Sequence, residues 1–548
     1  MNATDRSEEA IYCDGRIQVS LVELYSPLPQ DFPAHPERLD RLAYLRYRLA
    51  DGPDRAEDAD AILVIQPGNF LGPHSLDGVA RGSVLAAADK GRVVEFWALA
   101  RRSEGADDPT GVMAALAAND PDIAFDYYFG GATVAGRAFE GFRSGGEQPF
   151  LAELGFARVV RDLHEILVRE IPDSQVRRRK VFLGGHSGGA SVTAAFGSWD
   201  FDGTPGHDMC RGFIALDTPL DCHFGLRSNT ALRVLSAPFT AAAGLAYPWV
   251  VRALRAGRLH RSSGRLSTMA IEVNRLLGLY AHLTPHAEGD LLRRVTESVE
   301  GSDLHGPWRM LVRLLSATTL RQARTGRPDP LDRRLTCAAE FGMWIGSGVT
   351  PNIGRIGIGA LDGPVRTRSF PAPAWLWRVP VLRGPVAFVF GYRPLVAPAD
   401  RGHLYSWRNE PGPGQPADFA ATARAVAGGP RSAVEPYHPV RFPLDQTFAL
   451  LGVRSGDLAA IRHERGMRAK PLLSVFESHV PLAPYIPLMN TGVAHVIPGY
   501  AHDDIPFATP RPDGSPEPVS DHIADFVAAH TTAEFAATDI AMLASGGA

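Results

Sequence analysis

The most constraining feature of the sequence is a glycine-rich turn between a short apolar run and a helix-like segment. The turn reads Gly185-His186-Ser187-Gly188-Gly189; it follows the apolar run 181–183 and precedes the small residues of 188–196. Glycines on both sides of the serine permit a turn that is too tight for larger side chains. Such a strand–turn–helix unit raises its central residue above the end of a sheet. We therefore predict that Ser187 lies at the tip of a sharp turn.

Other apolar runs alternate with helix-like segments on both sides of this turn. The expected strands are 61–65, 92–99, 181–183, 212–216, 471–476 and 494–497, and the expected helices are 76–89, 151–170, 188–196 and 522–529. Short strands that are apolar throughout and separated by helices indicate a mostly parallel sheet that is covered on both faces. Sheets of this kind bind ligands at the carboxyl ends of their strands.

The alternation breaks between Cys222 and Arg465, where helical patches and Pro/Gly-rich loops replace it. We predict one core interrupted by an insertion: residues 1–221 form the first part of the core, 222–465 an inserted, mainly helical cap or lid, and 466–548 the rest of the core. The apolar window 234–251 contains Pro238 and Pro248 and is too short for a membrane span. We expect it to be a buried or lid segment and expect no transmembrane segment.

The charge and the cysteine content of the chain limit which classes of binding partner and which cellular compartment we expect. The chain has 56 basic and 60 acidic residues, so no strong basic surface is expected and no nucleic-acid partner is predicted. The first residues lack the pattern of a secretory signal. The four cysteines form neither a disulfide framework nor a zinc-binding pair, and we expect free thiols in the cytoplasm.

A serine hydroxyl is a poor nucleophile unless a base lies within hydrogen-bond reach and an acid orients that base. His502 is the expected base, because it follows the last predicted strand in a loop that can return over the strand ends. The alternatives are His463, His479 and His495; of these, His495 falls inside a predicted strand.

Two carboxylates are candidates for the acid, and the sequence leaves the choice open. Asp217 directly follows the strand 212–216, and Glu477 ends the next predicted strand. The oxyanion that forms during attack needs two backbone donors. We expect them at Gly188, next to the nucleophile, and at Asn69, in the turn after the strand 61–65. Arg101 and Arg102 follow another strand, and we expect them to hold loops through salt bridges rather than to bind an acidic substrate.

Several stretches resemble bacterial α/β-hydrolases of the lipase and esterase type, in particular an actinobacterial group. The resemblance rests on the turn 185–189 and on the stretches 66–68, 95–102, 126–129, 199–203 and 499–502. Relatives often have Asp where this chain has Ala100. The resemblance implies an α/β-hydrolase fold, with Ser187 as nucleophile and His502 as base. In some lipases of this fold the acid follows the strand after the turn, which here is Asp217.

These residues predict hydrolysis of a carboxylic ester through an acyl-enzyme on Ser187. The aromatic, apolar cap favours a small hydrophobic ester or acyl substrate. An acyltransferase or cyclase would use the same acyl-enzyme, and a non-catalytic binding protein would leave the serine inert. This chemistry requires no metal and no organic cofactor.

Overall fold

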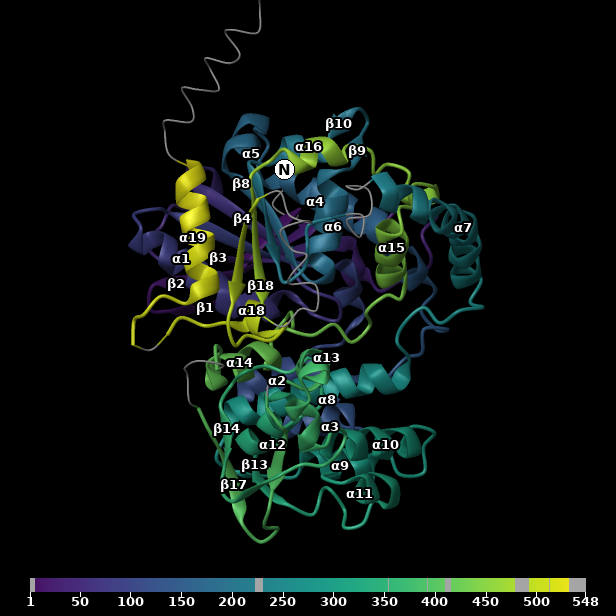
Figure 1. The fold of residues 1–548 in the computed structure, drawn as a ribbon, viewed down its shortest axis with the longest axis vertical. Helices are drawn as coiled ribbons and strands as arrows, with labels where there is room; N and C mark the ends of the chain where they lie inside the picture. The colour runs from purple at the N-terminus through teal and green to yellow at the C-terminus, as the bar shows by residue number, and fades with distance from the viewer. Residues whose placement is uncertain are drawn as a thin grey trace, which may run out of the picture.

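The computed structural model describes residues 5–221, 230–352, 354–391, 393–409, 415–478, 492–511 and 513–531. The alternative base His479, the cysteine Cys222 and the tail after Thr531 lie outside the described residues. The chain forms two bodies: one is built around a large sheet, and the other, below it in Figure 1, is mainly helical. No helix in the described ranges is both long and apolar enough to cross a membrane.

A nine-stranded sheet forms the centre of the upper body. Its strand order is β1-β2-β3-β5-β4-β8-β11-β18-β19. All pairs from β5 to β19 are parallel, and those from β1 to β5 are antiparallel. The bounds are β1 (Arg6–Asp14), β2 (Ile17–Tyr25), β3 (Arg41–Leu49), β4 (Ala61–Gln66), β5 (Val94–Ala100), β8 (Val181–His186), β11 (Gly212–Leu216), β18 (Leu472–Glu477) and β19 (Val493–Ile497). The predicted mostly parallel sheet is confirmed.

The antiparallel strands β1, β2 and β3 were not predicted from the sequence. Their sequences mix charged and apolar residues, as in Arg41-Leu42-Ala43-Tyr44-Leu45-Arg46 of β3, so they lack a continuous apolar run. Arg46 nevertheless lies buried, because its guanidinium is paired with Glu95 of β5. A cross-strand ion pair thus replaces the apolar side chain expected at such a position.

Alternate residues of the central strands pack into two different hydrophobic layers. In β4, Ile62 and Val64 join a cluster that includes helices α4 (Phe156–Glu170) and α6 (Gly188–Gly197). Leu63 and Ile65 point the other way, toward α1 (Asp77–Asp89) and α19 (Pro518–Thr531). Both faces are therefore covered, which explains why the strand is apolar at every position.

A third cluster holds the lower body together. It combines residues from α2 (Thr110–Ala118) and α3 (Asp122–Tyr128) with residues from helices far along the chain. These helices are α8 (Arg265–Leu283), α9 (Leu291–Ser298), α10 (His305–Ser316), α12 (Cys337–Ile345) and α14 (Phe419–Ala427). That residues 222–465 form one separate inserted domain remains a prediction. Its helices share their core with 112–128, which precede the predicted boundary.

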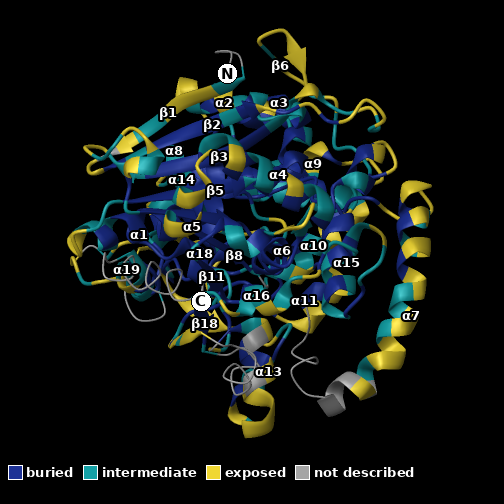
Figure 2. Cartoon of the chain, turned by 90° about the horizontal axis from the view of Figure 1, so that it is seen from above, coloured by how far each residue is buried: buried dark blue, intermediate teal, exposed yellow. Residues whose placement is uncertain are grey.

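Helix α7 (Thr230–Arg255) contains the apolar window 234–251 and lies against the upper body. Its buried residues Tyr247 and Val251 pack with Phe442 and Ala449 of α15 (Arg441–Leu450). The window was expected to be buried or to form a lid. One side of α7 is buried and the other is exposed (Figure 2), and the role as a lid stays a prediction. Three of the cysteines, Cys13, Cys210 and Cys337, are free thiols.

Candidate active site

Ser187 lies at the sharp turn between β8 and α6. Its φ is 52° and its ψ is −122°, a combination that a residue with a side chain rarely adopts. The neighbouring glycines make the turn possible: a Cβ on Gly185 would lie 2.2 Å from the backbone of Gly189, and one on Gly189 would lie 2.4 Å from the carbonyl oxygen of Gln66. The backbone N–H of Ser187 donates to Leu216 at 3.1 Å, which ties the turn to strand β11.

Asp217 follows β11 directly and therefore lies beside Ser187. Leu216 pairs with His186 in the parallel register, so the next residues of the two strands are neighbours. The backbone of Asp217 also has a positive φ, 52°, and its N–H donates to the carbonyl of Val475 in β18 at 2.7 Å. The backbone of Asp217 is therefore fixed to β18, next to the serine turn at the end of β8.

His502 approaches this carboxylate from the loop after β19. Its Nδ1 lies 2.5 Å from Oδ2 of Asp217, whose side chain is only 1% exposed. A carboxylate can only accept, so Nδ1 carries the hydrogen and Nε2 is left as the basic nitrogen. Burial disfavours the charged ring, but the hydrogen bond and the charge of Asp217 outweigh it and raise the pKa of His502 to about 9.

Glu477 contributes to the same group through its backbone. Its N–H donates to Oδ1 of Asp217 at 2.7 Å, while Nδ1 of His502 donates to the other carboxylate oxygen, Oδ2. The geometry thus places Asp217, and not the Glu477 carboxylate, in hydrogen-bond contact with the histidine. Among the alternative bases, His495 stacks on His522 at 3.6 Å, and His463 lies near Asp200.

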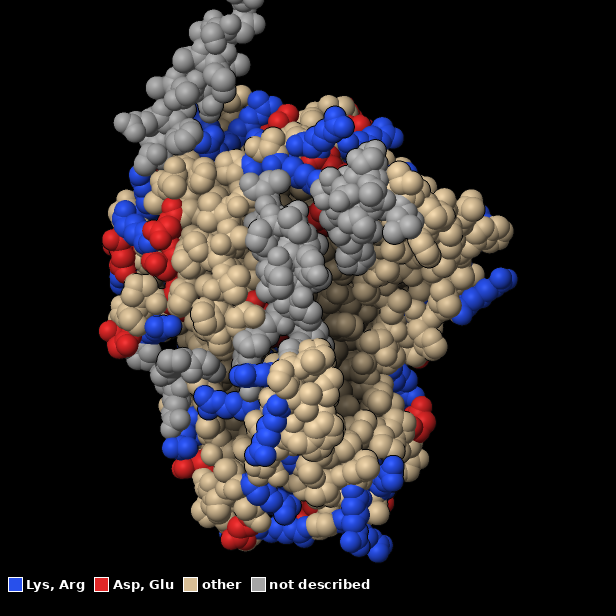
Figure 3. Space-filling view, in the orientation of Figure 1, with Lys and Arg blue, Asp and Glu red and all other residues tan. Residues whose placement is uncertain are grey.

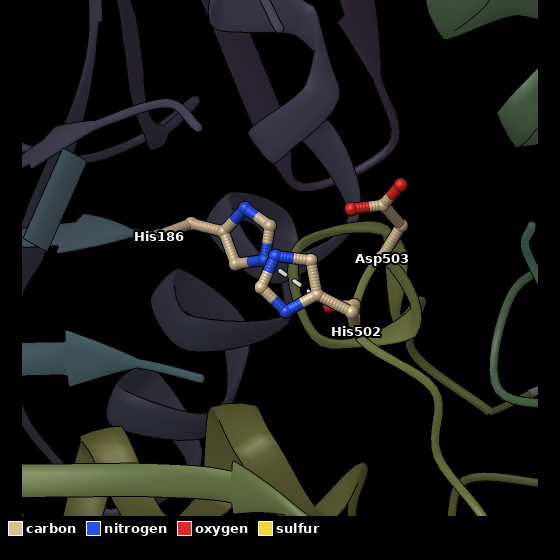
Figure 4. A group of neighbouring side chains, drawn as sticks. All are labelled: His186, His502 and Asp503. Atoms are coloured by element: carbon tan, nitrogen blue, oxygen red, sulfur yellow. Dashed lines mark hydrogen bonds between the residues drawn. The ribbon is translucent and has the colours of Figure 1, made fainter. Parts of the chain in front are cut away.

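His186, His502 and Asp503 form a compact group next to the turn (Figure 4). Their potential ligand atoms lie within 4.8 Å of one another, a spacing that would also suit a metal ion. The Nε2 of His186 instead donates to the carbonyl oxygen of His502 at 3.1 Å, and burial lowers the pKa of His186 well below its usual value. A neutral His186 thereby links the backbone of the serine turn to that of the histidine loop.

Gly188 and Asn69 meet on the other side of Ser187. A Cβ on Gly188 would lie 2.2 Å from Oδ1 of Asn69, so the two residues are in close contact. The backbone N–H groups of Gly188 and Asn69 make no hydrogen bond to any residue that the structure describes. Two unpaired donors beside a serine hydroxyl are the arrangement that an oxyanion hole requires. The Asn69 side chain donates to Gln446 of α15 at 3.2 Å.

Arg101 fixes the turn that carries Asn69. Its guanidinium donates to the carbonyl oxygens of Pro67 at 3.0 Å, Gly68 at 2.7 Å and Leu71 at 2.6 Å. It also pairs with Glu435 at 2.7 Å, and both side chains are buried. Burial alone would raise the pKa of Glu435, but Arg101 and His438 together lower it to about 2.

The expectation that Arg101 and Arg102 hold loops is therefore confirmed. Arg102 donates to Asp162 and to the carbonyl oxygens of Ser26 and Leu39. Glu435 and His438 were not singled out from the sequence, since they lie 334 and 337 positions beyond Arg101 and carry no motif. They are recognised only in the structure, where both polar side chains are buried.

No protein-family profile matches the chain, and no curated protein is similar to it in sequence. Among solved structures, a peroxisomal α/β-hydrolase of Saccharomyces cerevisiae is 10% identical over 97% of this chain and 98% of its own, with a TM-score of 0.33. A proline iminopeptidase of Mycobacterium smegmatis is 11% identical over 96% and 99%, with a TM-score of 0.26.

A protein from Sulfolobus solfataricus described as a candidate lipase is 15% identical over 38% of this chain, with a TM-score of 0.24. The match spans about half of that relative, 49% of its length. The strand order, the sharp turn at Ser187 and the helices on both faces of the sheet are those of the α/β-hydrolase fold that the sequence predicts.

Proposed function

We propose that the protein is a serine hydrolase that cleaves carboxylic esters of hydrophobic compounds, with Ser187 as nucleophile, His502 as base and Asp217 as the acid that orients the base. The observation that carries the proposal is the 2.5 Å contact between Asp217 and His502, located beside a serine held at positive φ. A structural serine has no need of this arrangement, because backbone strain of this kind is costly and is retained mainly at functional sites.

In this mechanism the Ser187 hydroxyl attacks the ester carbonyl while Nε2 of His502 takes its proton. Asp217 keeps the proton on Nδ1 and stabilises the imidazolium that forms. The N–H groups of Gly188 and Asn69 bind the oxyanion of the tetrahedral intermediate. The intermediate collapses, the alcohol leaves with the proton from His502, and an acyl-serine remains. Water, activated by the same histidine, then releases the acid and restores the serine.

Labelling with a fluorophosphonate probe tests this proposal. We expect the wild-type protein to be labelled and Ser187→Ala to be unlabelled, because only an activated serine reacts. Ser198→Ala, at the C-terminal end of the same helix, is the matched control and should label like the wild type. Labelling that persists in Ser187→Ala, or a wild-type protein that is not labelled, would contradict the proposal.

Product analysis distinguishes hydrolysis from acyl transfer. The unmodified wild-type enzyme, incubated with an aryl ester in the presence of an added alcohol, should release mainly the free acid. A predominance of the new ester would show that an acceptor other than water resolves the acyl-enzyme.

A further inference from the structure

One side of α7 is exposed and apolar along most of its length. Val234, Phe239, Leu245 and Trp249 are 68–75% exposed, whereas Tyr247 and Val251 on the other side are buried. Residues 234–251 contain no charged side chain. Large apolar side chains are individually common on protein surfaces, but a continuous row of them indicates an interaction site.

A second apolar projection is formed by η7 (Ala374–Arg378) and α13 (Pro380–Phe390). Val381 is 85% exposed, and Trp375, Leu382 and Val389 are exposed with it. In the space-filling view, the surface of α13 and that of α7 lie on either side of a hollow between the two bodies (Figure 3). Basic side chains (blue) border α13 in this view, and no acidic side chains (red) lie among them.

The segments that carry these apolar surfaces have only positive charges. No Asp or Glu occurs in 222–271 or in 363–399, although the whole chain has a net charge of −4. Arg252, Arg258, Arg378 and Arg383 are exposed, and none of them forms an ion pair with a residue that the structure describes. Arg252 lies over the ring of Trp249 at 5.2 Å.

Both projections connect to the candidate active site. Arg355 donates to the carbonyl oxygens of Ala387 and Val389 near the end of α13, and its charge also acts on Asp503 and Asp504 beside His502. On the other side, Tyr247 of α7 donates to Asp445 of α15. The next residue of α15, Gln446, accepts from Asn69 of the candidate oxyanion turn.

We propose that α7 and the segment from η7 to α13 dock the protein on the surface of an anionic lipid bilayer. Apolar and aromatic side chains enter the interface, while arginines beside them reach the headgroups. The charge pattern argues against a second copy of the chain as the occupant. A symmetric contact through this surface would bring arginines against arginines, and no carboxylate in these two segments could neutralise them.

Co-sedimentation with lipid vesicles tests the docking surface, and the Ser187→Ala protein is used so that the result does not depend on catalysis. We expect binding to vesicles of phosphatidylcholine mixed with phosphatidylglycerol, weaker binding to phosphatidylcholine alone, and loss of binding at high salt. We expect about tenfold or more weaker binding for each of three variants, Phe239→Glu and Leu245→Glu on α7 and Val381→Glu on α13. Each variant places a charge where an apolar side chain would be buried in the bilayer.

Charge variants and a matched control complete the test. Arg252→Gln and Arg383→Gln should each weaken binding about fivefold, which corresponds to about 1 kcal/mol per basic residue near the membrane surface. Met310→Glu on α10, 52% exposed but outside both projections, should bind like the parent protein. All these positions are exposed, so unchanged thermal melting verifies that the variants are folded.

Three results would overturn the inference. The first is no binding of the parent protein to anionic vesicles. The second is equal binding by Leu245→Glu and the parent protein. The third is a concentration-dependent dimer in solution that Leu245→Glu dissociates, which would assign the surface to a second copy of the chain. Since labelling of Ser187 is measured separately, failure of the docking proposal and failure of the proposed catalysis are distinguishable.

Discussion

Two residues of the candidate site, Ser187 and Asp217, adopt positive φ at the ends of neighbouring strands, and neither is a glycine. Each such residue costs of order 1–3 kcal/mol and persists only where its surroundings hold it. The holding contacts are visible: Ser187 donates to Leu216, and Asp217 donates to Val475. The two strained residues thus end neighbouring strands at the same edge of the sheet, where His502 contacts the carboxylate of Asp217.

The protonation of His502 sets the expected pH dependence. A ring whose pKa is about 9 is charged at neutral pH in the free enzyme and cannot accept the serine proton. We therefore expect kcat/KM for an aryl ester to rise with pH along a limb centred near pH 9 and to level off above it. Asp217→Asn removes the charge that raises this pKa, so the rising limb should move to lower pH. A limb centred near pH 6.5 in the wild-type protein would contradict this assignment.

The roles of Asp217 and Glu477 can be separated by paired amide variants. Asp217→Asn should lower kcat by on the order of 10⁴-fold, the loss typical when the histidine loses its orienting carboxylate. Glu477→Gln retains the backbone N–H that donates to Asp217, so its loss should remain below about tenfold. Steady-state kinetics of the two variants measure these losses in kcat. A larger loss in Glu477→Gln than in Asp217→Asn would make Glu477 the acid.

At the scale of elements, the backbone of the turn 67–71 is held by a residue that follows a neighbouring strand. Arg101, which follows β5, donates to three carbonyl oxygens of this turn. Glu435 accepts from Arg101 and from Ser103, and its own N–H donates to Phe70 at 2.8 Å. A loop far along the chain therefore helps to hold the backbone that presents the N–H of Asn69.

Disruption of this network should affect both stability and catalysis. Arg101→Met deprives the buried carboxylate of Glu435 of its guanidinium partner and leaves it with His438 and Ser103, and we expect a loss of about 3 kcal/mol in the free energy of unfolding in urea. In the folded protein kcat should fall more than KM rises, because the oxyanion donor acts mainly in the transition state.

The matched control for Arg101→Met is Arg16→Met. Arg16 pairs with Asp89 at 3.3 Å, but both side chains are largely exposed. An exposed pair of this kind should contribute less than about 1 kcal/mol, and activity should be unchanged. Equal destabilisation by the two substitutions would refute the role given to the buried network.

For the whole molecule, the lower body is assembled from two distant stretches of chain. Residues 112–128 pack in one hydrophobic cluster with residues from 269 to 433. Trp308 belongs to this cluster: it is fully buried, and its indole N–H donates to Thr296 at 3.0 Å. The sheet has its own separate clusters.

Trp308→Ala should destabilise the lower body selectively. We expect a loss of about 3–5 kcal/mol, as is typical for a large aromatic residue removed from a core. Hydrogen exchange should show reduced protection in α8 and α12 and also in α2 and α3, while β4 and β8 keep theirs. If α2 and α3 retain full protection, their stability does not depend on the shared cluster.

Much of the fold was predictable because its elements are locally encoded. Continuous apolar runs identify β4, β8, β11 and β18, since strands covered on both faces need no polar positions. The glycines around Ser187 identify the sharp turn, because a Cβ at Gly185 or Gly189 would clash with the nearby backbone. The position of His502 after the last strand also follows from chain order alone.

Other features depend on contacts that no local pattern contains. The contact of His502 with Asp217 rather than with the Glu477 carboxylate depends on the register of β11 between β8 and β18, in which the N–H of Glu477 donates to Asp217. Glu435 reaches Arg101 across 334 positions, and the exposed side of α7 reads in the sequence like a buried one. Sequence periodicity records which residues are apolar, but only the packing of distant elements decides which of them are covered and which charges meet.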